Sequence, residues 1–387
     1  MFLSSCGRYF VRASSFALVA IVSTKLILES QRFLPQLLVS TTTAAQENKS
    51  NVDQWTEELL RQKHKGCELY SLDNASRKKV VIQQHLGLWS GGPEALVQLA
   101  LAFHSWLPSS TYAQIYLGHR ELACDRYPQF CDINLLLDYS DLRSGDVLII
   151  PELMMCPQHL VRKGVNVFVW QLGATSFDAR RNQTEEGCKH ISHNYWLSSQ
   201  FGLNLPSSHI LVPYISENKL YNGTFSNEKR ENLILINGHD AASLELTYIR
   251  EYCESRNCST QVLINFGNAE LMDLYSKAKM IVSFCMRGSE RSPIEAVLRG
   301  VVLVSNNCQS AEDGRDFPIP RNNLVPILNG STAVADIVER VMENFSVEQA
   351  RYSAMRSLYM HYGRQTLSAD TRCFMQAIEN SSSVNYR

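Results

Sequence analysis

The chain has 387 residues, of which 45% are apolar and 19% are charged, and its formal net charge is −1. These values are typical of a globular protein that is long enough for two domains, each with its own hydrophobic core. The near-neutral charge gives no electrostatic support to a nucleic-acid partner, so we expect none.

The first 29 residues predict a secretory signal peptide or a retained signal-anchor. Arg8 and Arg12 precede an apolar run at Ala13–Ser23, Lys25 follows it, and the first acidic residue is Glu29. A positive flank before a short apolar run is typical of such segments. We therefore expect the chain to contact a membrane through this segment. A start that contains arginine and serine but no acid also fits a mitochondrial transit peptide, and that alternative stays open.

Glycosylation motifs favour the secretory route. Chance predicts about three Asn-x-Ser/Thr motifs in a chain of this composition. The chain has eight, at Asn48, Asn74, Asn182, Asn222, Asn257, Asn329, Asn344 and Asn380. We expect a glycoprotein of the endoplasmic reticulum or Golgi membrane, with the main part of the chain in the lumen.

The eleven cysteines suit an oxidising compartment. Cys124 and Cys131, and likewise Cys253 and Cys258, are close enough in sequence for local disulfides. Cys285 sits in an apolar run and is expected to be a small buried side chain. No Cys-x-x-Cys pair occurs, so a zinc ribbon or thioredoxin-like redox chemistry finds no support.

Residues 30–76 are polar and predict a stem, with one helix around Trp55–Lys63. A first Rossmann-like domain is predicted over residues 77–215. It opens with a strand at Lys78–Gln83, a turn at Gly91-Gly92-Pro93-Glu94 and a helix at Ala95–Trp106. No Gly-x-Gly-x-x-Gly follows the strand, so a dinucleotide cofactor finds no support. Further strands are expected at Ala113–Leu117, Val147–Pro151, Val165–Trp170 and Ile210–Tyr214. His190 and His193 are expected to be loop residues.

Residues 216–231 are polar and predict a linker to a second Rossmann-like domain at 232–345. The second domain is expected to alternate strands and helices. The predicted elements are a strand at Asn232–Ile236, a helix at Ser243–Glu254, a strand at Thr260–Phe266 and a helix at Ala269–Lys279. Residues 346–387 are expected to form helices, at about Val347–His361 and Ala369–Glu379, that pack back on the first domain.

The segment Met280–Asn307 predicts a compact strand–helix–strand unit. An apolar strand ends near Cys285, and Ser292 and Pro293 predict the N-cap and first residue of a helix that stops at Gly300. The turn between them suits an anion, because the free N–H groups and dipole of a helix start favour negative charge. Arg287 and Arg291 would add positive charge, and Glu290 and Glu295 could grip hydroxyls. An ordinary crossover with its charges in water is the alternative.

Two of these segments resemble loops of the GT-B glycosyltransferases. The sequence from Gly288 to Ser305 is similar to the donor-binding segment of that family, and Gly91-Gly92-Pro93-Glu94 is similar to its first-domain loop. The resemblance implies an α/β fold in which two Rossmann-like domains with parallel sheets face a central cleft. It also implies a hexosyltransferase that moves a sugar from a nucleotide-sugar donor to a glycan, protein or lipid acceptor.

The resemblance further implies which residues bind the donor. Glu295 matches the residue that grips the nucleotide ribose in retaining members of the family. Arg287 stands where those members have a second glutamate, and Asn237–Asp240 lacks their lysine, with His239 as a weak substitute. No Asp-x-Asp occurs, so we expect a metal-independent reaction with no cofactor besides the donor substrate, and we assign no catalytic residue. A catalytically silent GT-B-like protein that binds glycans or partner proteins is the alternative. The predicted donor-binding residues are Gly91, Gly92, Arg287, Gly288, Ser289, Glu290, Arg291 and Glu295.

Overall fold

The structure is a computed structural model. It describes residues 54–384 apart from positions 55, 66, 68–77, 84–90, 108–112, 117–138, 174–182, 185, 201–204, 217–229, 239–243, 285, 287, 289 and 326–329. The predicted signal or anchor at residues 1–29 lies outside the described residues, as do most of the predicted stem and linker. Within the described part of the chain, no helix is long and apolar enough to cross a bilayer.

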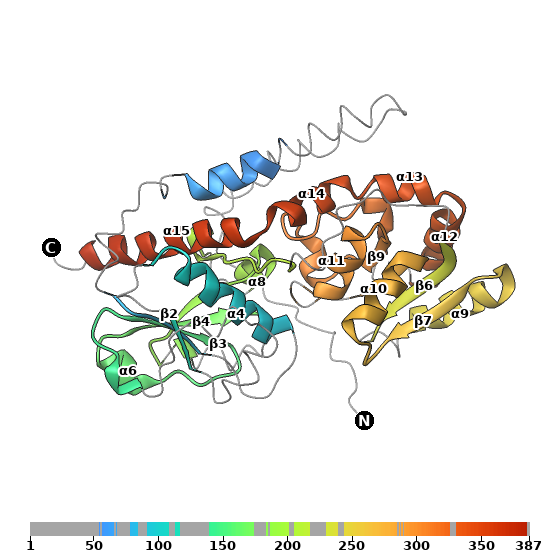
Figure 1. The fold of residues 1–387 in the computed structure, drawn as a ribbon. Coiled ribbons are helices and arrows are strands. Elements are labelled where there is room, and N and C mark those ends of the chain that lie inside the picture. Colours follow the sequence, from blue (N-terminus) through green and yellow to red (C-terminus); the bar gives the residue numbers. More distant parts are fainter. Residues whose placement is uncertain are drawn as a thin grey trace, which may run out of the picture. The chain divides into compact units, whose positions relative to one another are not determined.

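The described strands form two sheets of five strands each (Figure 1). The first sheet has the order β2-β1-β3-β4-β5, and all neighbouring strands are parallel. Its strands are β1 (Val80–Gln83), β2 (Ala113–Tyr116), β3 (Val147–Pro151), β4 (Asn166–Gln171) and β5 (Lys189–Ser192). The helical elements of this half are α4 (Gly91–His104), η2 (Tyr139–Asp141), α6 (Gln158–Arg162), α8 (Tyr195–Gln200) and η3 (Ser207–His209).

Alternate residues of the first sheet serve two separate cores. Val80 and Ile82 join the core that contains Phe374 of α15 (Arg364–Val384) and the apolar side chains of α4. Val81 joins the opposite core, which contains Leu160 of α6. Successive side chains of a strand point to opposite faces, so a sheet covered on both sides needs strands that are apolar throughout. The sequences of β1 and β3, VVIQ and VLIIP, are buried throughout, and Gln83 is their one polar residue.

The second sheet has the order β10-β9-β8-β6-β7 and is also parallel. Its strands are β6 (Glu231–Asn237), β7 (Ser259–Leu263), β8 (Ala278–Val282), β9 (Val302–Asn306) and β10 (Leu324–Val325). The accompanying helical elements are α9 (Leu244–Arg256), α10 (Asn268–Lys277), α11 (Arg291–Leu298), η6 (Gln309–Glu312), η7 (Arg321–Asn323), α12 (Gly330–Glu343), α13 (Phe345–Ala350) and α14 (Ser353–His361). The two parallel sheets confirm the predicted fold class.

Two of the expected elements have no single counterpart in the structure. Ile210–Tyr214 is not a strand, because only Ile210 makes an isolated bridge, to Ser192 of β5. The edge position belongs instead to β5, which places His190 inside a strand and leaves His193 directly after it. The expected helix at Val347–His361 is two helices, α13 and α14, separated at Arg351 and Tyr352.

The C-terminal helices divide between the two halves. We expected residues 346–387 to pack back on the first domain, and α15 packs there through Leu367, Phe374 and Ile378. Helix α14 instead contributes Met355 and Leu358 to the core of the second sheet. The turn between α14 and α15 is therefore one place where the chain passes from the second core to the first.

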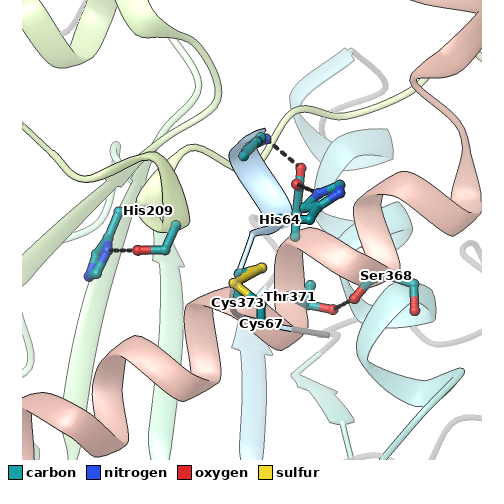
Figure 2. The surroundings of a disulfide bond; sticks show 9 residues. His64, Cys67, His209, Ser368, Thr371 and Cys373 are labelled. Carbon is teal, nitrogen blue, oxygen red and sulfur yellow. Dashed lines mark hydrogen bonds and ion pairs between the residues drawn. A yellow bond between two sulfur atoms is a disulfide. The ribbon is translucent and has the colours of Figure 1, made fainter. Parts of the chain in front are cut away.

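A helical segment at residues 56–64, here called the strap helix, docks on α14 and α15. The Oγ atoms of Thr56 and Ser357 lie 3.2 Å apart, and Lys63 forms a buried ion pair with Asp370 at 2.7 Å. His64 contacts the other oxygen of the same carboxylate at 2.7 Å. Cys67 is joined to Cys373 of α15, with His64 nearby (Figure 2). The strap helix thus contacts both α14, which packs in the core of the second sheet, and α15, which packs in a core of the first.

Three disulfides join described cysteines. The local pair Cys253–Cys258 confirms the spacing argument. Cys156–Cys188 and Cys67–Cys373 are separated by 32 and 306 residues, and sequence spacing gave no sign of them. Cys124, Cys131 and Cys285 lie outside the described residues.

Candidate functional site

The predicted anion-binding turn connects β8 to α11. The helix begins at Arg291, one residue before the predicted N-cap, and Glu290 takes the N-cap position with φ −63° and ψ 123°. Ser292 and Pro293 therefore lie in the first turn, where proline is tolerated because the first N–H groups of a helix have no partner within it. The start of a helix favours an anion, because its first N–H groups and the helix dipole point toward the preceding turn. Arg287 and Ser289 lie outside the described residues.

Gly288 brings this turn against the first half of the chain. A Cβ atom built on Gly288 would lie 2.9 Å from the carbonyl oxygen of Leu172 and 2.9 Å from Cε1 of His193. Both distances are shorter than real Cβ contacts, so any side chain here would force the backbone or the histidine to move. Leu172 follows β4 and His193 follows β5. The glycine therefore allows the turn to reach the carboxyl ends of two strands of the first sheet.

His193 is a site residue that the sequence did not identify. Its Nδ1 atom lies 2.7 Å from the carbonyl oxygen of Gln171, and since a carbonyl only accepts, Nδ1 donates this hydrogen bond. Burial lowers the pKa of His193 to about 4, so the ring is neutral at neutral pH. Its Nε2 atom lies 3.1 Å from the Cβ position of Gly288. The position of His193, directly after a strand of a parallel sheet, is a signal for a ligand site, because ligands of parallel sheets bind beyond the carboxyl ends of strands.

More polar groups gather at the same edge of the first sheet. The side-chain amide of Gln171 lies 3.1 Å from Nδ1 of His190, whose Nε2 lies 2.8 Å from the hydroxyl of Thr184. Glu152 follows β3, and one of its carboxylate oxygens accepts the N–H of Leu172 at 3.2 Å. Burial raises the pKa of Glu152 to about 7. This edge therefore carries both a neutral histidine and a carboxyl group that titrates near neutral pH.

Glu290 is held by the first strand of the second sheet. The side-chain amide of Asn237, at the end of β6, donates to Oε2 of Glu290 at 2.8 Å and to the hydroxyl of Ser283 at 3.0 Å. Gly238 follows, and a Cβ atom there would lie 2.6 Å from the carbonyl oxygen of Leu263. The ends of β6 and β8 are thus tied to the start of α11. The suggested substitute for the missing lysine, His239, lies outside the described residues.

Arg291 joins the two predicted donor loops. Its guanidinium pairs with Glu94 at 2.5 Å, donates to the carbonyl of Tyr214 at 3.0 Å and lies 3.9 Å from Glu295. Glu94 also accepts the hydroxyl of Ser216 at 2.6 Å. Glu94 belongs to the first turn of α4, because that helix begins at Gly91 and not at Ala95. The structure thus brings the Gly91–Gly92 turn and α11 together through the partly buried Arg291 and the buried Glu94.

A second set of contacts lies beyond β9. The carboxylate of Asp316 accepts the N–H groups of Tyr195 and Trp196, at 2.9 and 2.7 Å, at the start of α8. Asn194 donates to the hydroxyl of Ser310 at 3.2 Å. Burial, and then the charge of Asp313, raise the pKa of Asp316 to about 8. Segments that follow strands of both sheets therefore meet at α8 as well.

Comparison with known proteins identifies the fold. No protein-family model matches the chain, and no curated protein matches its sequence. Among solved structures, Anabaena Alr3699/HepE in complex with UDP and glucose is 10% identical with a TM-score of 0.51, and the match covers 79% of this chain and 100% of HepE. HepE in complex with UDP gives 11% identity and a TM-score of 0.50 over the same shares of the two chains.

The pneumococcal O-GlcNAc transferase GtfA in complex with UDP and GlcNAc is 14% identical, with a TM-score of 0.43 over 62% of this chain and 58% of GtfA. This chain thus spans little more than half of GtfA. At identities this low, a structural match supports a statement about the fold alone. The match to HepE extends over most of both chains. The chain therefore has the GT-B fold, as the resemblance of its two loops predicted.

Proposed function

We propose that this chain is a nucleotide-sugar-dependent glycosyltransferase that moves a hexose to a glycan, protein or lipid acceptor. One observation carries the proposal: Gly288, in the turn that resembles a donor-binding loop, is packed against His193 and the carbonyl of Leu172. The turn that would hold a diphosphate therefore adjoins the strand ends that would face an acceptor.

The chemistry of the turn supports this proposal. Free N–H groups at the start of α11 favour a negatively charged ligand, and the hydroxyls of a ribose or hexose suit a carboxylate such as Glu290. A transfer without a metal would depend on positioning and on stabilising the charge of the departing diphosphate. The structural neighbour HepE was solved with UDP and glucose, which suggests these compounds as first probes.

A catalytically silent protein that binds glycans or partner proteins is the second candidate. The contacts of Arg291 favour it. This arginine is engaged by Glu94 and lies against Glu295, which is only 3% exposed. In this alternative, Arg291 and Glu295 hold α11 against α4 and bind no donor.

We also propose that the chain enters the secretory pathway, with its N-terminal segment in the membrane and the described part in the lumen. Three disulfides between described cysteines suit an oxidising compartment. Removal of N-linked glycans from cell-made protein by an endoglycosidase should lower its apparent mass. An unchanged mass together with import into mitochondria would favour the transit-peptide alternative.

Thermal melting of the full chain in detergent, with UDP, GDP, UDP-glucose and GDP-mannose, tests the donor site. A ligand that binds only the folded state stabilises it by RT ln(1 + [L]/Kd), which is about 2.7 kcal/mol at one hundred times Kd. We expect at least one of these compounds to raise the midpoint. If none does so at millimolar concentration, the silent, partner-binding alternative stands in place of the enzyme.

A further inference from the structure

Glu152 is a partly exposed carboxylate at the carboxyl end of β3. One of its oxygens accepts the N–H of Leu172 at 3.2 Å, and no lysine or arginine of the described residues forms an ion pair with it. The amide of Gln183 holds the backbone on both sides, since it donates to the carbonyls of Glu152 and Met154 at 3.0 and 2.8 Å. The carboxylate is thus fixed in place without being neutralised.

In space, Leu172 lies between Glu152 and the turn that we propose binds the donor. The N–H of Leu172 faces the carboxylate of Glu152, and the carbonyl of the same residue lies 2.9 Å from the Cβ position of Gly288. His193 contacts that Cβ position as well. Glu152 and the turn before α11 therefore flank a single residue at the edge of the first sheet.

The other carboxylates around the turn are already engaged. Glu94 pairs with Arg291 at 2.5 Å, and Glu295 lies 3.9 Å from the same guanidinium. Glu290 accepts a hydrogen bond from Asn237 at 2.8 Å and forms the N-cap of α11. Among the described carboxylates of this site, Glu152 is the one that only backbone N–H groups hold. Its carboxylate can therefore accept a further hydrogen bond.

We propose that Glu152 is the general base that accepts the proton of the acceptor hydroxyl, an assignment that rests on the proposed glycosyltransferase function. As the acceptor oxygen bonds to the anomeric carbon, its proton passes to Glu152. The bond from that carbon to the diphosphate oxygen breaks, and its electron pair leaves with the nucleoside diphosphate. Glu152 then returns the proton to water. This single displacement inverts the configuration at the anomeric carbon.

The surroundings of Glu152 suit a base that works near neutral pH. The groups that act on it are burial, which favours the neutral form, and the backbone N–H groups of Glu152 and Leu172, which favour the charged form. The net result is a raised pKa of about 7, and no charged side chain of the described residues is among the causes. A base whose pKa lies near the working pH combines sufficient basicity with sufficient ionisation.

The test compares Glu152→Gln with wild-type full chain. The donor is the nucleotide sugar from the melting panel that stabilises the wild type, and slow hydrolysis is followed by release of its nucleoside diphosphate. Loss of a general base should lower this rate by about 10²–10⁴-fold. Nucleotide binding, measured by melting, should stay unchanged.

The pH dependence of the rate is a second readout. The wild-type rate should fall about tenfold per pH unit below pH 7, and the variant should lose this dependence. Asp141→Asn, which removes an exposed carboxylate of the same half, is the matched control.

The outcomes separate the two proposals. If no nucleotide binds the wild type, the glycosyltransferase function falls, and the assignment of Glu152 falls with it. If nucleotide binds but Glu152→Gln hydrolyses the donor as fast as the wild type, only the assignment of Glu152 is overturned. The same holds if the wild type binds nucleotide but releases none from any bound sugar donor.

Discussion

Gly288 owes its importance to the atoms that surround it. The carbonyl of Leu172 belongs to the backbone and cannot rotate away, and the ring of His193 is fixed by its bond to Gln171. Neither neighbour can move aside for a methyl group without a cost in free energy. The need for glycine here comes from a close approach between two segments, because the φ angle of Gly288 is not in the left-handed region.

Gly288→Ala should weaken nucleotide binding at least tenfold, because the added methyl pushes the turn away from the first sheet. The same overpacking should lower the free energy of unfolding by about 1–3 kcal/mol. Calorimetric titration with the nucleotide that binds best, together with urea unfolding, measures both effects. Gly314→Ala is the matched control, since a Cβ atom at Gly314 would meet nothing within 4 Å. Equal nucleotide affinity in both variants would show that the turn does not bind the donor.

The sequence predicted which residue types form the turn before α11, but not which residues they contact. Gly288 and Glu290 could be selected because glycine, a carboxylate and a following helix form a local pattern. His193 was not selected, because its contacts depend on β4 and on a turn about 95 positions later in the chain, and because the strand that precedes it was not predicted. The partners of Arg291 were also missed, because Glu94 is a non-local contact across the two halves.

Secondary structure was predictable where apolar runs are long. The strand Val147–Pro151 was predicted with the boundaries that the structure has, because all five of its residues are buried. β5 was missed because its four residues, KHIS, include a lysine and a histidine and give no apolar run. The start of α11 was misplaced because Ser292–Pro293 is a strong local signal, whereas Glu290 takes the N-cap position without any capping hydrogen bond from its side chain.

The strap helix makes a testable contribution to stability. Cys67→Ser should lower the free energy of unfolding by about 2–5 kcal/mol, because the lost disulfide closes a loop of 306 residues in the unfolded chain. Cys253→Ser, which opens a separation of only five residues, should cost less. Urea unfolding under non-reducing conditions compares the two variants. If Cys67→Ser is as stable as the wild type, the Cys67–Cys373 disulfide adds nothing to the stability of the folded state.

The whole molecule should lose stability as the pH rises from 6.5 to 8. The raised pKa of Asp316, about 8, means that the folded state keeps a proton that the unfolded state releases near pH 4. This contribution is complete below pH 4 and disappears as the pH passes 8. The expected slope approaches about 1.4 kcal/mol per pH unit for one proton. Urea unfolding at pH 6.5, 7.2 and 8.0 measures the decline.

Asp316→Asn should flatten this decline, because asparagine does not titrate. It should also lower stability at pH 6.5, since the amide has one oxygen in place of the two that accept the N–H groups of Tyr195 and Trp196. A decline of unchanged steepness in the variant would assign the effect to other groups. Glu152 is one such group, since its pKa of about 7 acts in the same direction.

The bond between Cys67 and Cys373 also orders the events of biosynthesis. Cys156 and Cys188, and later Cys253 and Cys258, can pair while the ribosome is still at work. Cys67 must wait until another 306 residues have been made, which takes about 15–60 s at 5–20 residues per second. Through that interval its thiol is open to premature pairing with any cysteine that emerges first. The bond between Cys67 and Cys373 can therefore form only after all four cysteines of the other two described disulfides have been synthesised.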